Sequence, residues 1–144
     1  MEYRTNGHAK FNIQYHFVWI TKYRYKVITP EIAKRLKILL VQGCNSNGIK
    51  IVKGHLDYDH VHLLLSCPPD ISPAKIAQLL KGRSSRLLQD EFPGLKRRYW
   101  GQHLWGRGYF CATVGAMTDE MIQEYIEHHT EAEDNISLPD EFQS

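Results

Sequence analysis

The segment FNIQYHFVWITK, residues 11–22, sets the pattern from which the rest of the chain can be read. Successive side chains of a β-strand point to opposite faces, so this run of aromatic and β-branched residues divides into two sets. One face holds Ile13, Tyr15, Phe17 and Trp19, and the other holds Gln14, His16, Val18 and Ile20. Both sets are largely apolar, which predicts a central strand that is covered on both sides.

The residues that follow predict a helix and then two paired strands. Thr29-Pro30-Glu31 places a capping hydroxyl, a proline and an acid at a helix start, and the helix is expected to end at residues 45–48. Ile49–Leu56 and Val61–Ser66 are predicted to be strands, joined by a tight turn at Tyr58-Asp59.

The second half of the chain repeats this alternation. Ser72-Pro73 opens a second helix, Pro93-Gly94 predicts a turn, and residues 99–114 carry aromatic strand material interrupted by glycines. A last helix is predicted from Thr118 to about Ala132. The apolar stripe of the second helix would be Ile76, Leu79, Leu80, Leu87 and Leu88. The order β-α-β-β-α-β-α predicts an α+β fold of the ferredoxin-like, split β-α-β type, with an antiparallel sheet, two helices on one face and an added C-terminal helix.

Length and composition are those of one globular domain, expected at residues 1–134, followed by an acidic tail at 135–144 that is expected to be loose. No segment is long and apolar enough to cross a membrane, and the polar start MEYRTNGHAK lacks the apolar core of a signal peptide. Cys44, Cys67 and Cys111 are widely spaced and odd in number. They are interpreted as reduced thiols, which indicates a cytoplasmic protein.

Charge is distributed unevenly along the chain. Residues 1–118 contain all 18 Lys and Arg but only seven of the 16 Asp and Glu, which gives them a net charge of +11. A basic body with an acidic tail suits a polyanionic partner such as nucleic acid. The alternative is an acidic tail that merely keeps the protein soluble.

Two pairs of side chains indicate chemistry. His60 and His62 would project from the same side of a strand, about 7 Å apart, and Tyr125 and His129 would share one face of the last helix. Imidazoles commonly bind divalent metals, and a bound metal could stabilise the phenolate of a tyrosine whose pKa is ordinarily near 10. Each pair alone also fits a structural role, since strand histidines are often hydrogen-bonded and Tyr125 could belong to an apolar packing stripe. Together they predict metal-assisted attack of a tyrosine on a phosphodiester.

Two basic clusters are candidates for DNA contact. Residues 22–26, KYRYK, alternate cations with aromatic rings, which suits phosphate binding combined with base stacking. Residues 81–86, KGRSSR, lie on the second predicted helix and are reinforced by the basic run at 96–98. The predicted DNA-binding residues are Lys22, Tyr23, Arg24, Lys26, Lys81, Arg83, Ser84 and Arg86.

The ordered motifs resemble one family, the small HUH transposases with a single catalytic tyrosine (TnpA), which move single-stranded insertion sequences. The resemblance covers about residues 10–134. The matching motifs are YHFVWITKYR (15–24), DHVHLLL (59–65), LKGRSSR (80–86), LWGRGYF (104–110), TVG (113–115) and IQEYIEHH (122–129).

This resemblance implies an activity and the residues that carry it. His60 and His62 would be the metal-binding pair, Tyr125 the nucleophile, and His129 would stand where the family usually has a glutamine as third metal ligand. The metal is expected to be Mg²⁺, and an imidazole at 129 could shift the preference toward Mn²⁺. The family forms a 5′-phosphotyrosine link, acts on single-stranded DNA with hairpin ends, and works as a homodimer whose active sites combine both subunits.

Three other interpretations remain open from the residues. A domesticated relative that processes repeated palindromes would carry the same motifs. A non-catalytic nucleic-acid-binding domain of ferredoxin-like fold would explain the basic clusters but leave the histidines and Tyr125 without a role. A structural zinc site formed by His60, His62 and Cys67 is disfavoured, because strand alternation places Cys67 on the opposite face from the histidines.

Overall fold

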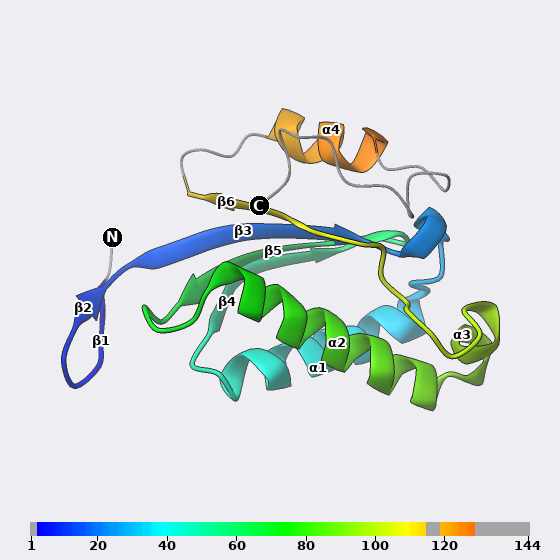
Figure 1. Ribbon diagram of the computed structural model, residues 1–144, viewed down its shortest axis with the longest axis horizontal. Coiled ribbons are helices and arrows are strands. Elements are labelled where there is room, and N and C mark those ends of the chain that lie inside the picture. The colour runs from blue at the N-terminus through cyan, green and yellow to red at the C-terminus, as the bar shows by residue number, and fades with distance from the viewer. Residues whose placement is uncertain (1–2, 115–118, 129–144) are drawn as a thin grey trace.

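A four-stranded antiparallel sheet forms the centre of the protein (Figure 1), and the computed structural model describes residues 3–114 and 119–128. The strands are β3 (Ile13–Ile20), β4 (Lys50–Leu56), β5 (His60–Cys67) and β6 (Phe110–Thr113), in the order β4-β5-β3-β6. The predicted central strand is confirmed, because β3 pairs with β5 on one side and with β6 on the other. The α+β class and the split β-α-β order are confirmed as well.

Two long helices cover one face of the sheet (Figure 1). They are α1 (Pro30–Asn45) and α2 (Pro73–Glu91), and each begins where the sequence predicts. Thr29 Oγ1 accepts a hydrogen bond from the Ile32 amide at 3.4 Å, and Ser72 Oγ accepts one from the Lys75 amide at 3.1 Å. A capping hydroxyl followed by proline therefore fixes both helix starts.

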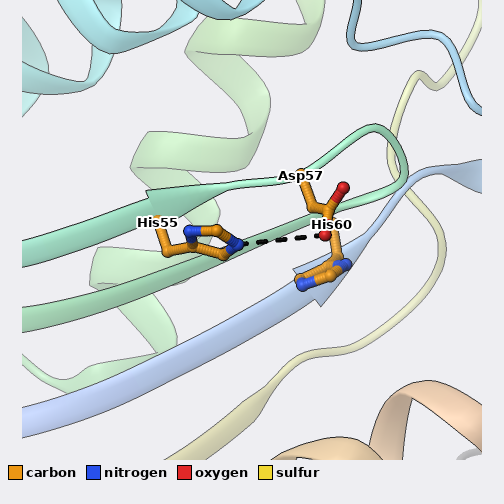
Figure 2. Close-up of side chains that lie close together, drawn as sticks. All are labelled: His55, Asp57 and His60. Carbon is orange, nitrogen blue, oxygen red and sulfur yellow. Dashed lines mark ion pairs between the residues drawn. The ribbon is translucent and has the colours of Figure 1, made fainter.

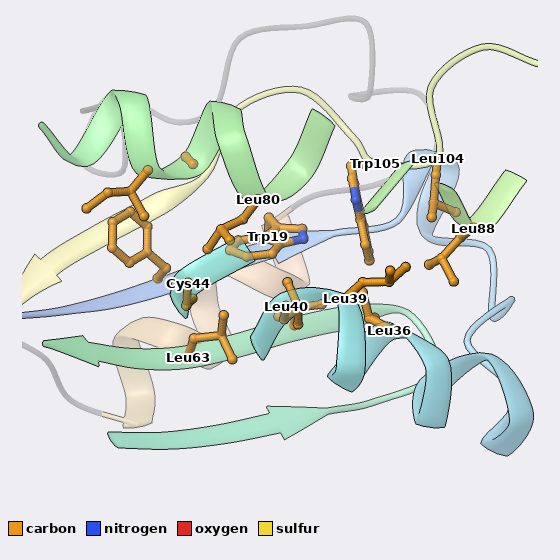
Figure 3. Packing of buried hydrophobic residues seen from close by; sticks show 14 of the residues in the cluster. Trp19, Leu36, Leu39, Leu40, Cys44, Leu63, Leu80, Leu88, Leu104 and Trp105 are labelled. Atoms are coloured by element: carbon orange, nitrogen blue, oxygen red, sulfur yellow. The ribbon is translucent and has the colours of Figure 1, made fainter. Parts of the chain in front are cut away.

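The main core lies between these helices and the sheet (Figure 3). The ring centroids of Trp19, from β3, and Trp105, from the segment before β6, lie 6.0 Å apart in an edge-to-face arrangement. The labelled aliphatic residues around the two indoles are Leu36, Leu39, Leu40, Leu63, Leu80, Leu88 and Leu104. This layer covers one face of the sheet and leaves the opposite face for other contacts.

The buried face of α2 is more polar than its apolar pattern predicts. Leu79 and Leu87 are only half-buried, whereas Ser84, Ser85 and Gln89 are buried. Ser84 Oγ accepts a hydrogen bond from Trp105 Nε1 at 2.9 Å, and Ser85 Oγ accepts one from the Leu104 amide at 3.1 Å. Gln89 Nε2 donates to the carbonyl of Gln102. These bonds attach the segment at residues 102–105 to α2.

Several predicted elements differ in the structure. Pro93-Gly94 is not a turn but the start of a short helix, α3 (Pro93–Arg98), because proline is equally suited to the first helical position. Of the aromatic segment at 99–114, only β6 is a strand. A two-stranded hairpin of β1 (Arg4–Thr5) and β2 (Lys10–Phe11), and the single turn η1 (Lys22–Arg24), were not predicted.

Among the residues that the structure describes, the second face of the sheet carries one helix, α4 (Asp119–His128) (Figure 1). Ile122, Tyr125 and Ile126 from α4 form a small cluster that is separate from the main core. Its sheet side consists of Val18, Ile20 and Phe110, the even-numbered residues of β3 and β6. This surface is called the α4 face below.

All three cysteines are free, and burial raises the pKa of Cys44 and Cys111 to about 12 and that of Cys67 to about 11. Cys67 belongs to the main core, on the face away from the histidines, as strand alternation predicts. No helix within the described ranges has both the length and the apolar character that a membrane span requires. The predicted tail at 135–144 lies outside the described residues.

Candidate functional site

Strand pairing gathers four histidines on the α4 face. His60 and His62 lie on β5, and His55 on β4 pairs directly with His62. His62 also pairs with Val18 of β3, so His16, two residues earlier on β3, points to the same side. The predicted pair of histidines is therefore part of a larger imidazole cluster that spans three strands.

His60 is held by the residue directly before it. Its Nδ1 lies 2.8 Å from Asp59 Oδ1, and both side chains are nearly buried, with 14% and 13% of their surface exposed. Asp59 Oδ2 also contacts Arg24 Nη2 at 3.3 Å. The hydrogen bond from His60 and the positive charge of Arg24 hold the pKa of Asp59 below its usual range despite burial. A carboxylate on Nδ1 fixes the ring orientation and leaves Nε2 as the metal-binding nitrogen.

His62 has a different partner. Its Nε2 lies 3.1 Å from Nδ1 of His16, and the two ring centroids are 5.3 Å apart. One ring must donate and the other accept, so the bond fixes complementary tautomers of the two imidazoles.

His60 also faces the turn between β4 and β5 (Figure 2). The ligand atoms of His55, Asp57 and His60 all lie within 4.8 Å of one another, and His55 Nε2 is 3.8 Å from Asp57 Oδ2. Asp57 Oδ1 accepts a hydrogen bond from the Tyr58 amide at 2.7 Å, which holds the carboxylate in place. Imidazole and carboxylate are a donor set that divalent cations accept, so these residues fit a divalent metal. His129, the predicted third ligand, lies outside the described residues.

Tyr125 reaches the same face from α4. It is fully buried, and its ring centroid lies 5.9 Å from that of Phe110. Packing between α4 and the even-numbered residues of β3 thus brings the predicted nucleophile to the histidine-bearing side of the sheet. A phenol without exposed surface can meet a DNA strand only if α4 changes its position.

The first predicted DNA-binding cluster lies at the end of β3. Tyr23 and Arg24 adopt φ angles of 60° and 53°, in the left-handed region that residues other than glycine rarely enter. The Lys22 ammonium lies 5.3 Å from the centre of the Tyr23 ring, Arg24 contacts Asp59, and Lys26 is exposed. This turn is therefore joined directly to the histidine cluster through Arg24.

The second predicted cluster, on α2, is largely occupied by contacts within the protein. Lys81 Nζ donates to the carbonyls of Gly106 and Gly108 at 2.9 and 2.7 Å, and Arg83 Nη2 donates to Gln42 Oε1 at 2.8 Å. Ser84 is buried under Trp105 and offers DNA no surface. Arg86 is exposed.

Sequence reasoning missed four residues of the site, namely His16, His55, Asp57 and Asp59. The pattern Asp-His-x-His could have revealed Asp59, because a carboxylate next to a metal-binding imidazole commonly orients it. His16 and His55 could not be assigned to the site from the sequence. Their position beside His62 depends on how β3, β4 and β5 pair, and no local pattern reveals that register.

Comparison with known proteins identifies the family of this chain. The sequence pattern of the family described as "Transposase IS200 like" matches residues 9–129. The ISDra2 transposase TnpA of Deinococcus radiodurans is 37% identical over 123 residues, which are 85% of this chain and 88% of that protein. The transposase for insertion sequence element IS200 of Salmonella typhimurium is 34% identical over 92% of this chain and 89% of its own length.

Solved structures give the same result for the fold. The crystal structure of a candidate transposase from Deinococcus radiodurans has a TM-score of 0.80 at 36% identity, covering 88% of this chain and 97% of that one. A REP-associated tyrosine transposase bound to a REP hairpin has a TM-score of 0.52 at 10% identity, covering 89% of this chain and 70% of that one, a likeness of fold alone. With a family pattern that spans the strands, the histidine cluster and α4, this chain belongs to the IS200-like transposases.

Proposed function

We propose that this protein is a metal-dependent transposase that nicks and rejoins single-stranded DNA at hairpin-marked ends through a 5′-phosphotyrosine intermediate. The observation that carries the proposal is the convergence of Tyr125, from α4, and His60 and His62, from β5, on one face of the sheet. A non-catalytic binding domain would have no need of this arrangement. Reduced cysteines and the DNA substrate are both consistent with action in the cytoplasm.

In this mechanism Tyr125 is the nucleophile. Its phenolic oxygen attacks the scissile phosphorus, and the P–O bond to the 3′ oxygen breaks. The phenol loses one proton, and the departing 3′ oxygen takes one up. The DNA 5′ phosphate is then joined to the tyrosine and a free 3′-OH departs. Attack by a 3′-OH on the phosphotyrosine reverses these bond changes and restores a phosphodiester, so no external energy source is needed.

His60 and His62, with His129, are proposed to hold the divalent ion, which we expect to be Mg²⁺ with Mn²⁺ as an alternative. Such an ion would stabilise the charge that develops on the phosphate and the phenolate. Asp59 orients His60, and Arg24 in turn neutralises Asp59. Support for this assignment comes from the hydrogen bond between His60 Nδ1 and Asp59 Oδ1, which orients the His60 ring and leaves Nε2 directed away from Asp59.

A homodimer with composite active sites explains how the buried Tyr125 becomes available. The helix that carries Tyr125, α4, packs on the sheet through the small cluster of the α4 face and not through the main core. Detaching it would leave the four-stranded sheet and its two covering helices intact. We propose that α4 of one subunit serves the histidines of the other.

Complementation tests both the chemistry and this arrangement. Tyr125→Phe keeps the buried ring but has no nucleophile, and His60→Ala removes a metal ligand but keeps Tyr125. The probe is single-stranded DNA from the regions that flank this coding sequence, with Mg²⁺ or Mn²⁺. Each variant alone should bind the hairpin without nicking it, and mixed dimers should regain one intact site if sites are shared between subunits.

The controls separate two kinds of failure. His8→Ala, an exposed histidine near the N-terminus, should nick like the unmodified protein. No recovery on mixing, with subunit exchange verified, would overturn the shared sites but not the chemistry. Nicking at the unmodified rate by His60→Ala would overturn the metal assignment itself.

A further inference from the structure

Trp100 is the most exposed large apolar side chain among the described residues, with 89% of its surface open to solvent. The other two tryptophans, Trp19 and Trp105, are buried in the main core. Trp100 also has a φ of +55°, in the left-handed region that bulky residues avoid. An indole that is both strained and exposed contributes nothing to the core, so its position calls for another explanation.

The backbone on both sides of Trp100 is firmly held. The Gly101 amide donates to the carbonyl of Lys96 at 2.7 Å, and the amide of Trp100 itself donates to that of Arg97 at 3.4 Å. Tyr99 is buried, and its ring centroid lies 5.8 Å from that of Tyr25. The indole therefore projects from a fixed support at the end of α3.

Three consecutive cationic residues come shortly before this indole in the chain. Lys96, Arg97 and Arg98 precede it on α3, and all three are exposed. The Arg98 guanidinium lies 4.0 Å from the centre of the Tyr25 ring, which joins α3 to the η1 turn. A cationic surface with an outward-facing aromatic ring is the combination by which proteins bind single-stranded nucleic acid.

A basic pocket of about 420 Å³ lies a few residues further along the chain. His103, three residues after Trp100, is part of its wall, so the Cα atoms of Trp100 and His103 are at most about 11 Å apart. Three cationic side chains line it, and no acidic residue is among its described lining residues. The pocket is formed by Lys22, Lys81, Gly82, Ser85, His103, Trp105, Gly106 and Arg107. Lys81 is already bonded to two loop carbonyls, which leaves Lys22 and Arg107 as the cations for a phosphate.

We propose that Trp100 and this pocket form the binding site for the unpaired strand next to a DNA hairpin, with a base stacked on the indole and a neighbouring phosphate held by Lys22 and Arg107. The proposal rests on the function proposed above and names the surface that holds its single-stranded substrate. Stacking needs no particular base, so this site supplies affinity and not sequence recognition.

Tryptophan fluorescence gives a direct test with the full-length protein in metal-free buffer. Trp100 is the only one of the three tryptophans in the chain that is exposed, so stacking of a base should quench the emission that iodide can reach. A single-stranded thymidine decamer should quench this emission and protect it from iodide. Unchanged emission at saturating decamer would overturn the proposal.

Variants define what the ring and the charge contribute, with binding followed by the anisotropy of a labelled decamer. Trp100→Gly removes the ring and suits the positive φ, and it should weaken binding roughly 5- to 150-fold, the loss of one stacked base. Trp100→Phe should retain most of the affinity. Arg107→Ala should lower the slope of log affinity against log salt by about 0.7. Tyr3→Ala removes a ring that is 59% exposed beside β1, at the opposite end of the molecule (Figure 1), and should change nothing.

The outcomes also separate this proposal from the proposed function. Equal affinity of the Trp100→Gly and unmodified proteins would overturn the stacking site, even if Tyr125 still forms a covalent adduct with DNA. Quenching by a uridine decamer but not by the thymidine decamer would overturn the assignment to DNA. Loss of decamer binding in Trp100→Gly without any adduct in the unmodified protein would support the site and contradict the phosphotyrosine chemistry.

Discussion

Replacing Asp59 by asparagine should weaken divalent-metal binding by about 10- to 100-fold while the fold is retained. Asp59 Oδ1 lies 2.8 Å from His60 Nδ1, and both side chains are nearly buried, so little solvent competes for this bond. Asparagine has the same shape and can still accept the hydrogen bond. What it removes is the negative charge.

The size of the effect follows from that charge. A hydrogen bond to a charged group contributes about 1.5–3 kcal/mol, against about 0.5–1.5 kcal/mol between neutral groups. A bound cation makes the imidazole a stronger donor, so this bond strengthens on metal binding. A gain of about 1–1.5 kcal/mol, the difference between the two ranges, corresponds to roughly 5- to 13-fold in affinity. Loss of the attraction between the carboxylate and a bound cation adds to it, which brings the total into the expected range. Arg24 also loses its ionic partner, so a modest fall in thermal stability should accompany the change.

Titration calorimetry with Mn²⁺ measures this affinity directly. Asp90→Asn is the matched control, because Asp90 is exposed and contacts only Lys96, at 3.9 Å, among the ion pairs of the described residues. Its metal affinity should equal that of the unmodified protein. An Asp59→Asn protein that binds Mn²⁺ as tightly as the control would refute the role of Asp59 in orienting His60.

Three further predictions follow from the same contacts. Ser84→Ala leaves the buried Nε1–H of Trp105 without an acceptor and should lower the free energy of unfolding, measured by urea titration, by about 1–3 kcal/mol. Ser46→Ala, at an exposed hydroxyl, should have little effect. The pKa values of the three thiols are raised to about 11–12, so the thiols stay protonated at pH 8 and should react slowly with a thiol reagent. Unfolding should make the reaction rapid, and fast labelling of the native protein would contradict the raised pKa values. Arg86→Ala should lower the slope of log DNA affinity against log salt by about 0.7. Arg83→Ala should chiefly lower the free energy of unfolding, because Arg83 is hydrogen-bonded to Gln42. Equal slopes for Arg86→Ala and the unmodified protein would place Arg86 away from DNA.

Local patterns were enough to predict most of the fold. The starts of α1 and α2 depend on a capping residue and a proline next to it, and the face of each residue in β3 and β5 follows from alternation alone. The turn predicted at Pro93-Gly94 was wrong, since proline followed by glycine suits a turn and a helix start equally well and here begins α3. The β1–β2 hairpin is two residues per strand and too short to give a periodic pattern.

The site was predictable only where its residues are close in sequence. His60 and His62 follow from two-residue spacing, but the contacts of His62 with His16 and of His60 with His55 depend on strand register. The serine pair of α2 illustrates the opposite error. A polar run in a basic helix indicated DNA contact, whereas Ser84 in fact binds Trp105, twenty-one residues away in sequence.

The most direct test of the proposed chemistry is the site of covalent attachment to DNA. The unmodified protein is incubated with Mg²⁺ and the hairpin-bearing single strand from its own flanking sequence, and the adduct is digested and mapped by mass spectrometry. The mechanism predicts a nucleotide joined through its 5′ phosphate to Tyr125, and no adduct with Tyr125→Phe, whose buried ring still packs against Phe110. Attachment at any other residue, or nicking without an adduct, would contradict it.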